Sequence, residues 1–269
     1  MRRFIAGLFL FAFLAPSAPA SSGEPVDFRG IIERALALYR PRFAAQGVAL
    51  SFVETHDDMI KGGASRDDAA HASFSFDTGY YADPKVSADG FLFAVCHELG
   101  HLVAGAPRRA APPEYDGPMD QDADMLLSGE GQADYYAASK CMRLALDGQD
   151  NAAYLRAHPA PEALARECAG AYPDAGAAAL CQRVALAGKN FLDSFAIVVP
   201  TSFEARSPER VDHTSTILPS PQCRLDTIVA GALCPVDKDA PVDGRDPAVG
   251  SCTSRDFPAG ARPACWFRE

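Results

Sequence analysis

The sequence lacks the short motifs of several familiar enzyme classes. It contains no C-x-x-C pair, which counts against a cysteine-based zinc site and against a thioredoxin-like redox centre. It contains no G-x-S-x-G, so nothing in it supports a serine hydrolase. Beyond the N-terminus it has no apolar run that approaches the ~20 residues needed to span a membrane.

Basic residues are also fewer than acidic ones. The chain has 25 Lys and Arg residues against 35 Asp and Glu residues, which gives a formal net charge of −10. Nucleic acids and anionic membranes attract basic surfaces. We therefore expect neither a nucleic-acid partner nor an anionic membrane as a partner.

The N-terminus has the pattern of an export signal. Met1-Arg2-Arg3 is basic, the stretch from Phe4 to Leu14 is apolar, and Ala18-Pro19-Ala20 precedes the polar Ser21. A short basic start, an apolar stretch of this length and small residues before a cut are typical of a secretory signal peptide. We expect residues 1–20 to be that peptide and the mature protein to be periplasmic or secreted, without stable membrane insertion.

Eight cysteines remain after that cut. An even number of cysteines in an exported chain predicts disulfides, although eight of them allow 105 pairings. Neighbours in the sequence could form local disulfides, and these are Cys168 with Cys181, Cys223 with Cys234, and Cys252 with Cys265.

The hydrophobic pattern predicts a mostly helical α+β fold. Apolar side chains recur at helical spacing in residues 28–46 and 91–103, and residues 126–146 also read as a helix. Residues 48–53 and 72–76 read as strands, and Lys61-Gly62-Gly63 reads as a turn. From residue 235 onward the chain is rich in Pro, Gly and Asp, which predicts an irregular tail held by disulfides.

The predicted helix at 91–103 carries His97-Glu98-Leu99-Gly100-His101. Residues four apart lie on one helix face, so both imidazoles can reach one metal ion. Glu98 lies beside that face, and we expect it to act as general base for the attacking water and then as proton donor to the leaving amine. Gly100 costs ~1 kcal/mol in a helix, which suggests that a neighbouring backbone approaches closely there.

The third ligand must come from another segment. Ala104 and Pro107 stand where a metzincin has Gly and His, which excludes that class. Glu130 is the best candidate, because Asp134 follows one helical turn later and can accept the free ring N–H of a ligand histidine. The sequence thus predicts one Zn²⁺ per chain, with an open fourth coordination position.

The string His-Glu-Leu-Gly-His followed by Glu-Gly-Gln-Ala-Asp-Tyr-Tyr-Ala resembles the M48-type gluzincins, which include the CAAX prenyl endopeptidases and bacterial periplasmic relatives. The resemblance implies that His97, His101 and Glu130 bind zinc, that Glu98 is the catalytic base, and that Asp134 supports a ligand. It also implies a mostly helical, zincin-like α+β fold with a small sheet. An edge strand of that sheet, at residues 63–65 or 72–76, would hold the substrate backbone.

The chain departs from the family further downstream. Pro219 and Arg224 are kept, but Leu218 stands where the family often has a histidine. His213 could replace that histidine in stabilising the transition state. Arg224 could pair with Glu130 or Asp134, or it could anchor its loop. The membrane helices of the prenyl-processing members are missing, so we do not expect prenylated substrates.

These observations predict an exported zinc metalloendopeptidase that hydrolyses peptide bonds in a peptide or protein substrate through a metal-activated water. Residues 21–234 would form the metallopeptidase domain and residues 235–269 the disulfide-linked tail. An alternative is a catalytically idle zinc-binding module that holds a partner protein in the cell envelope. In a third reading, the tail blocks the site of a latent enzyme.

Overall fold

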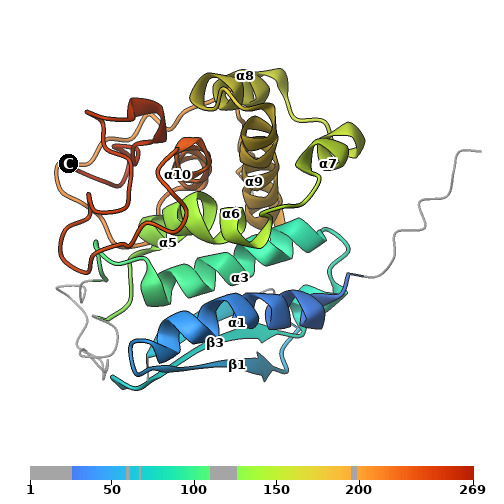
Figure 1. The fold of residues 1–269 in the computed structure, drawn as a ribbon, viewed down its shortest axis with the longest axis vertical. Helices are drawn as coiled ribbons and strands as arrows, with labels where there is room; N and C mark the ends of the chain where they lie inside the picture. Colours follow the sequence, from blue (N-terminus) through green and yellow to red (C-terminus); the bar gives the residue numbers. More distant parts are fainter. Residues whose placement is uncertain (1–25, 59–60, 67, 110–125, 195–198) are drawn as a thin grey trace, which may run out of the picture.

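A computed structural model describes residues 26–58, 61–66, 68–109, 126–194 and 199–269 (Figure 1). The predicted signal peptide at residues 1–20 lies outside these ranges. The described part is mostly helical with one small sheet, so the predicted fold class is confirmed. No helix within the described ranges is long and apolar enough to cross a membrane.

The sheet has three strands: β1 (Ala49–Thr55), β2 (Gly62–Arg66) and β3 (His71–Asp77). Their order is β1-β3-β2, with β1 parallel and β2 antiparallel to β3. The alternative that residues 72–76 form an edge is therefore wrong, because they lie in the central strand. Residues 63–65 do lie in an edge strand, and Gly62 and Gly63 begin that strand instead of forming the predicted turn.

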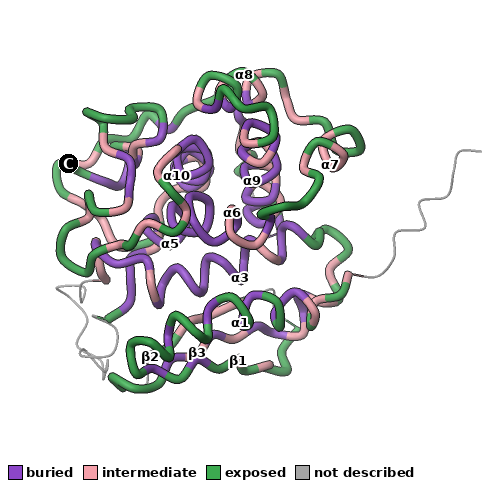
Figure 2. Tube along the Cα trace, in the orientation of Figure 1, coloured by how far each residue is buried: buried purple, intermediate pink, exposed green. Residues whose placement is uncertain are grey.

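Two helices connect the sheet to the rest of the molecule. α1 (Phe28–Ala44) packs on β1, while α3 (Ala88–Val103) contacts β2 and β3, and α2 (Gly79–Ala82) is a single turn between the sheet and α3. The Ser87 side chain caps α3 by accepting a hydrogen bond from the backbone N–H of Gly90. Gly105 ends it with a φ of 74°. α3 is buried along nearly its whole length, so it is the central helix of the fold (Figure 2).

The remaining helices pack on the side of α3 that faces away from α1 (Figure 1). The predicted helix at 126–146 begins only at Glu130 and has three parts: α5 (Glu130–Tyr136), the π-helical turn η1 (Ala137–Cys141) and α6 (Met142–Ala145). After it come α7 (Asn151–Ala157), α8 (Glu162–Ala171), α9 (Ala175–Ser194) and α10 (Pro221–Leu233).

All eight cysteines form disulfides: Cys96–Cys141, Cys168–Cys181, Cys223–Cys265 and Cys234–Cys252. The predicted pair Cys168–Cys181 is confirmed, whereas the pairs 223–234 and 252–265 are wrong. Cys223 and Cys234 stand at opposite ends of α10. Eleven residues of helix separate their Cα atoms by ~16 Å, more than twice what a disulfide can bridge. Four disulfides indicate an oxidising environment outside the cytoplasm.

The tail is irregular, as predicted, apart from the short 3₁₀ helix η2 (Pro258–Gly260). It packs closely on α5. Trp266 is fully buried, and its ring lies where a side chain at Gly131 would stand. The Tyr135 hydroxyl donates to the carbonyl of Gly260 at 2.7 Å, and Arg262 donates to the Gln132 side chain at 2.9 Å. The tail therefore holds α5 in place.

Candidate metal centre

Three side chains from α3 and α5 bring their donor atoms to one point. The Nε2 atoms of His97 and His101 lie 3.1 Å apart. The Glu130 carboxylate lies 3.4 Å from Nε2 of His97 and 3.6 Å from Nε2 of His101. Donors at ~2.0–2.1 Å from a tetrahedral ion lie roughly 3.3 Å from one another, so these spacings suit a bound ion. His97, His101 and Glu130 could therefore hold a metal ion.

A glycine allows the two helices to come this close. A Cβ atom at Gly100 would stand 2.9 Å from the carbonyl oxygen and 3.0 Å from the Cα of Ala133 in α5. Both contacts are with backbone, which cannot rotate away. The close backbone approach expected at Gly100 is thus confirmed, and it brings Glu130 to the two histidines.

Polar contacts behind the two histidines orient their imidazole rings. Nδ1 of His101 donates to the Ser128 carbonyl at 2.8 Å, and Nδ1 of His97 lies 2.8 Å from Oδ1 of Asp134. Arg224, from α10, donates to both oxygens of Asp134 at 2.7 and 2.8 Å. Of the roles considered for Arg224, pairing with Asp134 is the one observed. These contacts leave Nε2 of each histidine pointing at the shared position.

The electrostatics of the group suit a cation. Burial alone lowers the pKa of His97, but the carboxylates of Asp134 and Glu130 outweigh it and raise that pKa to about 9. Burial and the neighbouring charge of His97 lower the pKa of His101 to about 3. Burial opposes ionisation of Glu130, yet its contacts with the two histidines hold its pKa well below the usual range. The site thus offers an ionised carboxylate, a neutral imidazole and an imidazole that can exchange its proton for a metal.

Glu98 is buried between the ligand helix and the edge strand. A Cβ atom at Gly62 would lie 2.8 Å from Oε1 of Glu98, so the start of β2 passes directly beside this carboxylate. Burial raises the pKa of Glu98 to about 7, and the charge of Glu130 adds to the effect. Glu98 does not belong to the group of three converging donors.

One residue of the site had no signal in the sequence. Nη2 of Arg109 donates to Oε1 of Glu130 at 2.9 Å and lies 3.3 Å from Nε2 of His101. Its backbone N–H donates to the carbonyl of Leu127 at 2.7 Å, which holds the segment against the start of α5. Arg109 follows α3 in a stretch without periodicity, so only the folded chain shows where it lies.

The expected role of His213 is not supported by its position. Its side chain is 87% exposed and pairs with Asp212 at 2.6 Å, whereas the two ligand histidines are buried. Leu218, which stands at the family's histidine position, is also exposed.

Comparisons with protein-family models, with curated proteins and with solved structures find no match for this chain.

Proposed function

We propose that this chain is an exported zinc metalloendopeptidase of the M48-type gluzincin class. The observation that carries the proposal is the convergence of His97, His101 and Glu130, whose donor atoms all lie within 4.8 Å of one another, with Glu98 buried beside them. Two imidazoles and one carboxylate are a donor set typical of catalytic zinc sites that keep one position open. When bound, zinc supplies Lewis-acid chemistry, which lowers the pKa of water and polarises a carbonyl group.

Glu98 is the proposed general base. It takes a proton from the water whose oxygen attacks the peptide carbonyl carbon, and it then gives that proton to the nitrogen as the C–N bond breaks. A pKa of about 7 suits both steps at neutral pH, because the group can accept and release a proton with similar ease. Its burial keeps bulk water away from the proton transfer.

The edge strand β2 is the proposed binding site for the substrate backbone. β3 pairs with one side of β2, and the other side has no partner strand in the sheet as described. An extended peptide can add to such an edge through main-chain hydrogen bonds. Because Gly62 lies beside Glu98, a peptide aligned with β2 would pass the proposed base. The substrate is therefore an unfolded or extended peptide segment.

The idle zinc-binding module remains the alternative, since Leu218 replaces the family histidine and Arg109 occupies one oxygen of Glu130. The test compares wild type with Glu98→Gln, which keeps the shape of the side chain but cannot accept the proton. Glu162→Gln, on the exposed surface of α8, is the matched control.

We expect wild type and Glu162→Gln to cleave members of a broad peptide library. Glu98→Gln should bind one zinc per chain and cleave at least about 100-fold more slowly. Equal cleavage by Glu98→Gln would refute the role of Glu98. Zinc-loaded wild type that cleaves no peptide would favour the binding module.

A further inference from the structure

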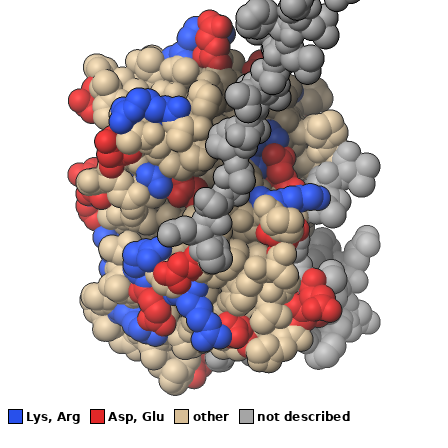
Figure 3. Space-filling view, turned by 90° about the vertical axis from the view of Figure 1, so that its right-hand side faces the viewer, with Lys and Arg blue, Asp and Glu red and all other residues tan. Residues whose placement is uncertain are grey.

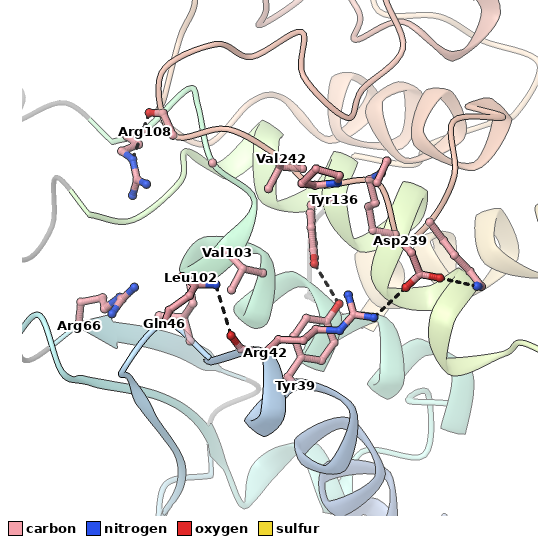
Figure 4. A pocket seen from close by; sticks show the side chains of 16 residues that line it. Tyr39, Arg42, Gln46, Arg66, Leu102, Val103, Arg108, Tyr136, Asp239 and Val242 are labelled. Atoms are coloured by element: carbon pink, nitrogen blue, oxygen red, sulfur yellow. Dashed lines mark hydrogen bonds and ion pairs between the residues drawn. The ribbon is translucent and has the colours of Figure 1, made fainter. Parts of the chain in front are cut away.

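A cavity of about 370 Å³ lies near the C-terminal ends of α1 and α3 (Figure 4). Its wall includes Arg66 at the end of β2, Arg108 beyond α3, and the tail segment 238–244. The volume falls within the ~300–1,000 Å³ range of small-molecule sites. None of the proposed zinc ligands lines it, so it is a separate place in the fold.

The charge of this cavity is opposite to that of the chain. Among the described residues, five cationic side chains and one carboxylate line it, although the chain as a whole carries −10. On the face drawn in Figure 3, basic and acidic side chains instead lie next to one another. The cavity's charged groups are Arg42, Arg66, Arg108, Lys140, Lys238 and Asp239.

Structural contacts account for three of the cations. Arg42 and Lys238 share the carboxylate of Asp239, at 2.9 and 2.8 Å. Lys140 donates to the carbonyl of Asp237 at 2.6 Å, which ties η1 to the tail. These three hold the tail against the helices, and no ligand is needed to explain them.

Arg66 and Arg108 are different, because neither has a carboxylate within 4 Å in the ranges that the structure describes. Nε of Arg66 is buried and has no hydrogen-bond partner there. Arg108 donates to the carbonyl oxygens of Leu126 and Gly244, which are neutral. Burial lowers the pKa of Arg66, and the charge of Arg108 lowers it further, so the two guanidinium groups repel each other.

The acidic groups whose charges act on these arginines already accept hydrogen bonds from other residues. Asp68 accepts hydrogen bonds from the ring of His71 and from the backbone N–H of Ala70. Asp243 accepts from the backbone N–H groups of Arg245 and Asp246. Two like charges facing one cavity without a shared counter-ion cost stability unless an anion joins them.

We propose that this cavity binds a phosphate-bearing small molecule, with Arg66 and Arg108 as the ligands of its phosphate group. Planar guanidinium groups donate paired hydrogen bonds to phosphate oxygens, and Arg66 has a buried donor free for that purpose. The cavity also has apolar wall, which includes Leu102, Val103 and Val242. It therefore suits a phosphomonoester that carries a small organic group.

The test titrates the full-length, zinc-loaded protein with glycerol 3-phosphate and with sulfate in a calorimeter. Arg66→Gln removes the positive charge of the arginine whose buried Nε has no hydrogen-bond partner among the described residues. Arg34→Gln, on the surface of α1 with a side chain 68% exposed, is the matched control. Circular dichroism checks that both variants are folded. Any binding to the zinc site is common to all three proteins, so the difference between them reports on the cavity.

We expect saturable binding to wild type with a Kd of about 1 mM or tighter, unchanged in Arg34→Gln and at least tenfold weaker in Arg66→Gln. Vesicles that contain phosphatidic acid, whose headgroup is a phosphomonoester, distinguish a lipid headgroup from a free phosphomonoester: sedimentation with these vesicles that depends on Arg66 assigns the headgroup. Wild type that binds neither glycerol 3-phosphate, sulfate nor vesicles would overturn the proposal. Equal binding by Arg66→Gln would overturn it as well.

Discussion

The substitution Gly100→Ala tests whether the approach of α3 and α5 builds the metal centre. Its effect on stability combines two opposing contributions. Alanine is favoured over glycine inside a helix by ~0.5–1 kcal/mol. Against this, the new methyl group would stand 2.9 Å from the carbonyl oxygen and 3.0 Å from the Cα of Ala133. Overpacking of this kind costs ~1–3 kcal/mol.

The clash should prevail, because the atoms that it meets belong to a helix backbone. We expect a net loss of ~1–2 kcal/mol in the free energy of unfolding. For a chain of this size, that corresponds to a fall of roughly 2–8 °C in melting temperature. The displacement of α5 also moves Glu130 from the histidines, so zinc affinity should fall by about 10–100-fold, as it does when ligands lose their support.

Gly170→Ala is the matched control. Gly170 lies in α8, and a Cβ atom there would have nothing within 4 Å. The helix preference then acts alone, and the variant should gain up to ~1 kcal/mol without a change in zinc affinity. Scanning calorimetry gives the stabilities, and competition with a chromophoric chelator gives the zinc affinities.

The reasoning would be refuted by a Gly100→Ala protein as stable as wild type or more so. It would fail equally if stability fell but zinc affinity stayed the same, because the packing of α5 on α3 would then not control the position of Glu130.

Three further predictions concern the ligands and their support. Glu130→Ala should lose most of the one zinc per chain that wild type binds, as measured by elemental analysis after dialysis; full zinc content would exclude Glu130 as a ligand. Asp134→Asn should weaken zinc binding by about 10–100-fold and, because it removes the charge of the carboxylate that pairs with the buried Arg224, destabilise the fold by ~3–5 kcal/mol. Unchanged affinity in the chelator competition would contradict the role of Asp134. Trp266→Ala should lower the free energy of unfolding in urea by ~3–5 kcal/mol with the disulfides intact. Phe257→Ala, at a tail position 43% exposed, should lower it much less. Equal losses would mean that the tail does not support α5.

Local spacing was enough to predict the core of the site. His97 and His101 share a helix face because they are four residues apart, and the same spacing relates Glu130 to Asp134. The structure brings both pairs together, and the reason suggested for Gly100 also holds. Each pair follows from the repeat of a single helix, whereas the meeting of Glu130 with the two histidines depends on the packing of α5 on α3.

The predictions that the structure contradicts concern contacts between segments that are far apart in the sequence. Gly62 and Gly63 have the composition of a turn, yet they pair with β3 as an edge strand. Glycine is required at position 62 because Phe76 and Glu98 leave no room for a side chain there. The helical rise of α10 keeps Cys223 away from Cys234, and the pairing then depends on the path of the tail. The contact of Arg109 with Glu130 likewise depends on how the chain returns after α3.

The contacts of the tail with α5 also bear on when the site can be completed during synthesis of the chain. Gly260 and Arg262 bind Tyr135 and Gln132 across 125 and 130 residues of sequence. A ribosome makes His97, His101, Glu130 and Glu98 before it makes the tail residues that contact α5. The segment of Glu130 thus gains its full support only after the tail has emerged and Cys223–Cys265 and Cys234–Cys252 have closed. If the site binds zinc as proposed, we expect metal loading to follow completion of the chain and closure of these disulfides.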